Sequence, residues 1–179
     1  MKRISIVFLG VLLGIAGIAS VADGNPPPPP DDPRFEFLRS LEGTWSAPPM
    51  GDDHPGSVFE FRVTSGGHAV EEREFVGTPM EMVTLYHMRG KDLMATHYCS
   101  LGNQPRAKAA PRVVDRGLRF DCAGTPGNAA SHDEEHIHGW AIRLLEDGSL
   151  NYSAQLVKNG EVTEAPDMVL TRVQKTASR

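Results

Sequence analysis

Apolar and polar residues alternate along much of this chain, a pattern with a period of two that is typical of strands with one buried face. In SVFEFRV, residues 57–63, the side chains of Phe59, Phe61 and Val63 share one side, while charged residues fall on the other. The first strand is expected to start at Thr44-Trp45. Further strands are expected in residues 68–76, 82–88, 93–99, 113–122, 134–146, 150–157 and 167–173. Short turns that contain glycine separate many of these segments, as tight hairpins require.

Short strands at spacings of about 8 to 12 residues predict an all-β fold, an antiparallel up-and-down sheet of about 8–10 strands. Closure of this sheet into a β-barrel would remove its exposed edges. Ahead of the first strand, Phe35, Leu38 and Leu41 recur every third residue, which predicts a short N-terminal helix that ends at Gly43. Segment 100–112 lacks alternation and is expected to be irregular.

The predicted helix and the Leu41-Glu42-Gly43-Thr44-Trp45 sequence that follows it resemble the entry into the first strand of the lipocalin and fatty-acid-binding-protein (calycin) superfamily. Segments 93–106 and 134–140 look most like exported bacterial lipocalin-like proteins of unknown function. The resemblance covers residues 35–173. It implies a barrel that encloses a ligand and is plugged at one end by Trp45, but it assigns no chemistry.

The N-terminus has the composition of an export signal. Lys2 and Arg3 precede an apolar run, and Ser20-Val21-Ala22 fits a small-residue cleavage site, so residues 1–22 are predicted to be removed. The alternative is a membrane anchor, but the run is shorter than the ~20 residues that span a bilayer and several glycines interrupt it. We therefore expect a periplasmic or secreted protein with no stable membrane insertion after cleavage.

The rest of the chain is expected to form one domain. Residues 23–34 include five consecutive prolines, Pro26–Pro30, and predict a stiff polyproline linker. Residues 35–174 would form the barrel, and 175–179 a disordered tail. The 179 residues are 40% hydrophobic and carry a net charge of -5, which is ordinary for a globular protein and argues against a nucleic-acid partner.

Chemistry enters with the side chains expected inside the barrel. In the strand from Glu134, alternation places His136, His138 and Trp140 on one face, and in the 93–99 strand it places His97 on the more apolar face. The full set of predicted ligand-binding residues is Glu72, His97, Arg106, Phe120, His136, His138 and Trp140. Such a set suits a small, largely apolar molecule held by a few polar groups.

Segment 68–76 has no purely apolar face, so at least one of its charges is expected inside, and Glu72 near its centre is the best candidate. A buried carboxylate needs a partner. Arg106 is one candidate for that partner; the alternative is that Arg106 lies in a solvated loop.

Three inward histidines, His97, His136 and His138, would also suit a metal site, because catalytic zinc commonly has three protein nitrogen ligands and one open position. A haem ligated by histidine is a further alternative, since barrels with a Gly-x-Trp entry include haem binders. In the competing interpretation, these histidines only hydrogen-bond to a ligand or to other polar groups. No zinc or haem is required by the sequence.

Cys99 and Cys122 are the only cysteines, and each ends a predicted strand. In an oxidising compartment a disulfide between them is one expectation, and two buried free thiols are the other.

Three functions remain open at this point. The leading prediction is an exported lipocalin-like barrel that binds a small hydrophobic molecule and has no enzymatic activity. The alternatives are a metal- or haem-dependent protein that uses His97, His136 and His138, and a structural domain associated with the cell envelope. The sequence does not predict an oligomeric state.

Overall fold

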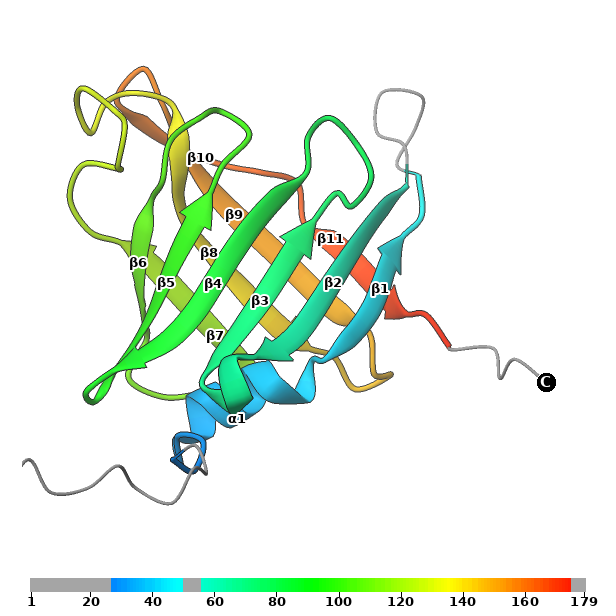
Figure 1. Ribbon diagram of the computed structural model, residues 1–179. Helices are drawn as coiled ribbons and strands as arrows, with labels where there is room; N and C mark the ends of the chain where they lie inside the picture. Colours follow the sequence, from blue (N-terminus) through cyan, green and yellow to red (C-terminus); the bar gives the residue numbers. More distant parts are fainter. Residues whose placement is uncertain (1–26, 50–55, 175–179) are drawn as a thin grey trace, which may run out of the picture.

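The computed structural model describes residues 27–49 and 56–174, which form a short helix and a closed antiparallel β-barrel (Figure 1). The predicted fold class is therefore confirmed. The elements are α1 (Pro33–Ser40), β1 (Gly43–Ala47), β2 (Ser57–Thr64), the 3-10 turn η1 (Ser65–Gly67), β3 (Ala69–Glu74), β4 (Met82–Arg89), β5 (Asp92–Tyr98), β6 (Arg106–Ala109), β7 (Gly117–Cys122), β8 (His136–Leu144), β9 (Leu150–Lys158), β10 (Glu161–Glu164) and β11 (Met168–Arg172).

The strands β1 to β8 pair in chain order, and β11 lies between β1 and β9. Because β8 also pairs with β9, the sheet closes on itself as a ring of ten strands. Strand β10 lies outside this ring and pairs only with the second half of β9, where Glu161 lies opposite Lys158. Closure leaves the barrel wall with no free edge.

Two strands lie where no strand was expected. Segment 100–112 contains β6, in which Ala107 and Ala109 are buried and alternate with exposed Arg106 and Lys108. Alanine has a weak hydrophobic signal, so the alternation is hard to detect in the sequence. Strand β10 follows the Asn159-Gly160 turn and is exposed at all four positions, so no apolar pattern marks it.

One end of the barrel, which we call the helix end, is closed by α1. Asp32 caps this helix by accepting a hydrogen bond from the Arg34 amide at 2.9 Å. The apolar side chains at this end are fully buried, namely Phe35, Leu38, Leu41 and Trp45. The Trp45 ring donates from Nε1 to the Leu41 carbonyl at 2.8 Å, so it occupies the plugging position that the calycin resemblance implies.

Arg172 covers the outer side of this plug. Its guanidinium lies 4.2 Å from the centre of the Trp45 ring and donates to the backbone carbonyls of Glu42 and Ser40. Gly43 makes this approach possible, because a Cβ there would lie 2.8 Å from Arg172 Nη1. The helix, β1 and the last strand are thereby joined at one point.

The opposite end, which we call the far end, carries the loops 75–81, 99–105 and 123–135 at the top of Figure 1. Some apolar side chains here are only partly buried against the core, namely Phe75, Ile137, Ala154 and Met168, whereas Val157 is buried. Partly buried apolar side chains also occur at the helix end, for example Phe37 and Met88.

Several predictions concern residues at the termini. The predicted signal (1–22) and disordered tail (175–179) lie outside the described residues, as does Pro26 of the linker. The described part of the linker contacts the barrel, because the Pro27 carbonyl lies 3.0 Å from Nε2 of His68, and α1 begins at Pro33 rather than near Phe35. Within ranges 27–49 and 56–174, no helix is both long and apolar enough to cross a bilayer.

Candidate functional site

A connected group of polar side chains lies inside the barrel. Glu72 on β3 is fully buried, as expected, and accepts a hydrogen bond from the Tyr86 hydroxyl on β4. The same hydroxyl accepts a hydrogen bond from Nε1 of Trp140 on β8 at 3.0 Å. Alternation along these strands places all three side chains on the inner face of the wall.

Burial dominates the electrostatics of Glu72. Removal from water raises the pKa of its carboxyl group well above the usual value, and the nearby charge of Glu74 raises it further. The hydrogen bond from Tyr86 acts in the opposite direction but is a smaller effect. Glu72 is therefore expected to hold its proton at pH values where an exposed glutamate has lost it.

His97 on β5 forms the second part of this group. Its Nδ1 lies 2.8 Å from the hydroxyl of Thr84 and 3.4 Å from a carboxylate oxygen of Glu74. Burial by itself lowers the pKa of His97, but contacts with Cys99 and Glu74 outweigh it and raise the pKa to about 10. We therefore expect His97 to be protonated at neutral pH.

Two polar atoms in this interior have no hydrogen-bond partner among the described residues: Oε1 of Glu72 and Nε2 of His97. The surrounding wall is aromatic, since Phe120 stacks on Trp140 with ring centres 5.2 Å apart and the His97 ring lies 6.0 Å from the Trp140 ring. We call Glu72, Glu74, Thr84, Tyr86, His97 and Trp140 the interior polar group.

Arg106 does not belong to this group, so the hypothesis that it pairs with Glu72 is wrong. Its side chain is exposed on the outer face of β6, where it alternates with buried Ala107. The carboxyl group of Glu72 instead accepts from the hydroxyl of Tyr86, and the buried Tyr152 also lowers its pKa as a hydrogen-bonding side chain. A neutral, protonated carboxyl group needs no cation, which explains why the barrel buries Glu72 without an arginine beside it.

A β-bulge between Ile137 and Gly139 separates the two histidines of β8 from Trp140. Because a bulge inserts one extra residue, the alternation changes phase there. Trp140 belongs to the interior cluster and Ile137 packs against it, whereas Val157, which pairs with His136, is buried outside that cluster. The expectation that His136 and His138 share a face with Trp140 is therefore wrong.

His136 and His138 lie together with His132, which comes from the 123–135 loop. We call these three residues the histidine cluster. Ring centres are 5.0 Å apart for His132 and His136, 5.2 Å for His132 and His138, and 5.7 Å for His136 and His138. One ring nitrogen from each residue lies within 4.8 Å of the others. His97 is not a member of this group.

The electrostatics of His138 agree with a position on the outer face of β8. Burial lowers its pKa, and the charges of His132 and His136 lower it further. Asp121 and Arg119, which are exposed on the outer face of β7, also act on it. The histidine cluster thus lies on the outer side of the barrel wall, under the 123–135 loop. The interior polar group lies on the inner side of the wall.

Cys99 and Cys122, the only cysteines, are both free thiols, so the predicted disulfide is not formed. Cys99 follows β5 and Cys122 ends β7, with β6 between them. Two strand spacings of ~4.8 Å exceed the Cα separation of about 7 Å that a bridge tolerates. Cys122 instead donates to the Ile137 carbonyl at 3.2 Å, and burial raises the pKa of its thiol to about 12.

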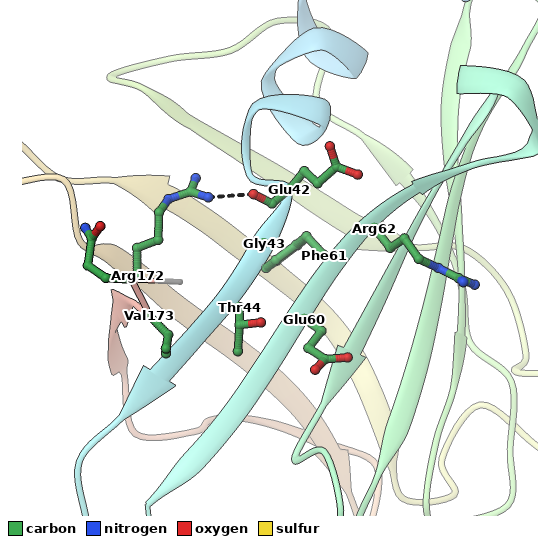
Figure 2. A pocket seen from close by; sticks show the side chains of 9 residues that line it. Glu42, Gly43, Thr44, Glu60, Phe61, Arg62, Arg172 and Val173 are labelled. Atoms are coloured by element: carbon green, nitrogen blue, oxygen red, sulfur yellow. Dashed lines mark hydrogen bonds between the residues drawn. The ribbon is translucent and has the colours of Figure 1, made fainter. Parts of the chain in front are cut away.

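A surface groove of about 560 Å³ lies at the helix end on the outside of β1, β2 and β11 (Figure 2). Figure 2 shows Arg172 crossing it to the backbone of Glu42 and Arg62 pointing away from it. Charged side chains make up much of its lining, including Glu42, Glu60 and Arg172. This lining does not suit the apolar ligand expected from the sequence.

No family model matches this chain, and no curated protein is significantly similar to it. The calycin likeness therefore depends on the barrel and on the arrangement of Gly43, Trp45 and α1.

Sequence reasoning found Glu72, His97, Phe120 and Trp140, which the fold brings together, but it missed other members of both groups. Tyr86 and Thr84 lie on the inner face of β4, which alternation alone could have assigned. His132 lies in the 123–135 loop, and no local pattern in the sequence indicates that this loop brings its ring to β8.

Proposed function

We propose that this protein binds a small, largely apolar molecule with one hydrogen-bonding group inside the far end of its barrel. The observation that carries the proposal is the pair of unpartnered polar atoms, Glu72 Oε1 and His97 Nε2, inside an otherwise apolar and aromatic wall. Buried polar atoms are nearly always hydrogen-bonded in folded proteins. A ligand group between these two atoms would satisfy both.

The partly buried side chains of the far end provide the route of entry. Phe75, Ile137 and Met168 pack against the core but keep some exposure, so they can move aside at a lower cost than the fully buried plug at the helix end. Deeper in, the stacked rings of Phe120 and Trp140 offer a flat apolar surface. This combination of apolar walls and few polar contacts is the usual make-up of a small-molecule site.

The charges of the interior polar group favour an uncharged head group in the ligand. Burial favours the neutral form of Glu72, and His97, whose pKa is raised, already has a carboxyl oxygen of Glu74 at 3.4 Å from its Nδ1. A charged ligand would bring a further charge into the barrel without a partner. A hydroxyl, carbonyl or amide group fits both free atoms.

We also propose that the protein acts outside the cytoplasm, on the evidence of the charged and apolar pattern in residues 1–22. Binding alone accounts for the interior polar group, and the proposal includes no catalytic step.

Native mass spectrometry of the protein purified from its own host tests both proposals, ligand binding and export. The expected result is a mass that begins at Asp23 together with a retained organic molecule. His97→Gln should lower the retained fraction at least about tenfold, since it removes a charge-assisted buried contact worth about 1.5–3 kcal/mol. Glu72→Leu removes a contact of a neutral carboxyl group, worth about 1 kcal/mol, and should lower the retained fraction by less. The matched control is Arg106→Gln, which changes an exposed residue of the same barrel and should retain the ligand.

Repeated absence of any bound molecule, with no uptake of lipophilic probes by the same preparation, would overturn ligand binding. A mass that still includes residues 1–22 in all fractions would overturn export.

A further inference from the structure

The histidine cluster has the features of a metal site and lies outside the region that the proposed ligand would occupy. Its three rings come from β8 and the preceding loop, and one nitrogen from each lies within 4.8 Å of the other two. Nitrogen ligands of a tetrahedral zinc ion, at ~2.0–2.1 Å from the metal, lie about 3.3 Å apart. Ring rotations that move each nitrogen by about an ångström would reach that geometry.

The hydrogen bond that His136 makes through Nδ1 leaves its Nε2 free to bind a metal ion. Its Nδ1 lies 2.7 Å from the Glu134 carbonyl oxygen, which can only accept, so Nδ1 carries the proton and Nε2 carries the lone pair. His136 is fully buried, and its Nε2 has no hydrogen-bond partner among the described residues. Metal-binding histidines are commonly oriented by this kind of backbone contact on the second nitrogen.

His138, on the same strand, also has a ring nitrogen without a hydrogen-bond partner among the described residues. This nitrogen is Nδ1, which is buried. The β-bulge between Ile137 and Gly139 turns this side chain to the side of His136. Bulges often redirect side chains beside functional sites. Each ring on β8 thus has a nitrogen without a partner in the part of the chain that the structure describes, and both rings lie close to the ring of His132, at 5.0 and 5.2 Å between ring centres.

The loop that supplies His132 is fastened on both sides. On one side, Asn103 Nδ2 donates to the Glu135 carbonyl at 2.8 Å, and Gln104 and Gly127 exchange two backbone hydrogen bonds. On the other side, the Gly160 amide donates to the Asp133 carbonyl at 3.2 Å. These contacts hold His132 near β8 before any ion arrives, which lowers the entropic cost of binding.

We propose that His132, His136 and His138 bind one divalent transition-metal ion, such as Zn²⁺, through His136 Nε2, His138 Nδ1 and one nitrogen of His132. Three imidazole ligands suit zinc and its late first-row neighbours rather than calcium or magnesium, which prefer oxygen. His132 and His138 are partly exposed, so the cluster lies near the surface. Asp121 lies near His138 and is paired with Arg119, with Arg119 Nε 2.7 Å from Asp121 Oδ1. This site goes beyond the proposed ligand binding and does not depend on it.

The test uses the purified full chain, stripped with a chelator and titrated with Zn²⁺ by calorimetry and with Co²⁺ by visible absorption. The expected results are one ion per chain, intense cobalt bands of a four-coordinate site, and a higher thermal unfolding temperature with zinc. His132→Ala and His138→Ala should each weaken zinc binding at least about 100-fold, because loss even of a group that only orients a ligand costs 10–100-fold.

Two control variants give the test its specificity. His87→Ala removes an exposed histidine of β4 and should leave zinc affinity unchanged. His97→Gln removes the interior histidine and should also retain the zinc while it loses the proposed organic ligand, so failure of one proposal is distinguishable from failure of the other. Thermal unfolding of each zinc-free variant confirms that it is folded.

The metal proposal is overturned if the chain takes up no Zn²⁺ at micromolar concentration. It is also overturned if His132→Ala and His87→Ala weaken binding equally, or if His97→Gln abolishes binding that folded His132→Ala retains.

Discussion

The two ends of the barrel use the same strands but bury different chemistry. At the helix end, Leu38 and Trp45 are fully buried, and Trp45 Nε1 has a backbone partner in Leu41. Toward the far end, the wall carries Glu74 and His97 inside and the histidine cluster outside, with unpartnered nitrogens in both places. The helix end therefore has the composition of a stabilising core, although Arg39 Nε on α1 also has no partner among the described residues, whereas the far end buries several polar side chains beside aromatic rings.

The largest expected effect is a loss of stability when the buried plug at the helix end is truncated. Trp45→Ala should lower the free energy of unfolding by about 3–5 kcal/mol, because it removes a large buried side chain and leaves a cavity. Urea unfolding measures this change. Val162→Ala on β10, where the side chain is 54% exposed, is the control and should change stability by less than about 0.5 kcal/mol. A small effect at Trp45 would show that the plug is not a stabilising element.

The second prediction concerns pH and the interior polar group. The pKa of His97 is raised to about 10 in the folded protein, so between about pH 6.5 and 10 the folded state binds more protons than the unfolded chain. The free energy of unfolding should therefore fall as pH rises through this window, by up to about 1.4 kcal/mol per pH unit. The raised pKa of Glu72 acts in the same direction from a lower pH.

His97→Gln isolates this effect, because glutamine keeps a polar group near Thr84 but cannot be protonated. Urea unfolding at several pH values should give a flatter profile for the variant than for the wild type. Equal slopes for the two proteins would mean that the pKa of His97 is not raised by folding.

A smaller effect is expected where the far-end loops meet. Asn103→Ala removes the hydrogen bond to the Glu135 carbonyl and should cost about 1 kcal/mol of stability and up to about tenfold in zinc affinity. Asn151→Ala is the matched control, since its hydrogen bond to Asp167 is exposed and remote from the histidine cluster. Equal zinc affinity in both variants would show that the loop anchor does not orient His132.

The smallest effect is expected from reduction. Since Cys99 and Cys122 are free thiols, a reducing agent should leave the unfolding temperature unchanged. Calorimetry with and without reductant measures it, and a drop of several degrees would indicate a disulfide.

Sequence patterns predicted much of the architecture because alternation and glycine turns are local signals. They placed most strands, the helix and Trp45, and they identified Glu72 as an inward charge. They failed at β6, where small alanines provide the buried face, and at β8, where one extra residue at Ile137/Gly139 changes the phase. No local pattern marks that bulge.

The two candidate sites differ in the same way. The interior polar group could be partly predicted, since Glu72, His97 and Trp140 follow from counting alternate positions. The histidine cluster could not be assembled, because the position of His132 depends on contacts of its loop with Gln104 and with Gly160 on neighbouring elements. Such contacts between distant segments leave no periodic signal in the sequence.

The two tryptophans of the chain allow a direct test of the proposed ligand site. Trp45 lies in the plug at the helix end, and Trp140 belongs to the interior polar group. Trp45→Phe leaves Trp140 as the only emitter, and Trp140→Phe leaves Trp45. A bromine-labelled fatty alcohol, which quenches tryptophan only at near contact, should quench Trp140 strongly and saturably and leave Trp45 emission almost unchanged. Equal quenching of both, or selective quenching of Trp45, would contradict a ligand site in the far end of the barrel.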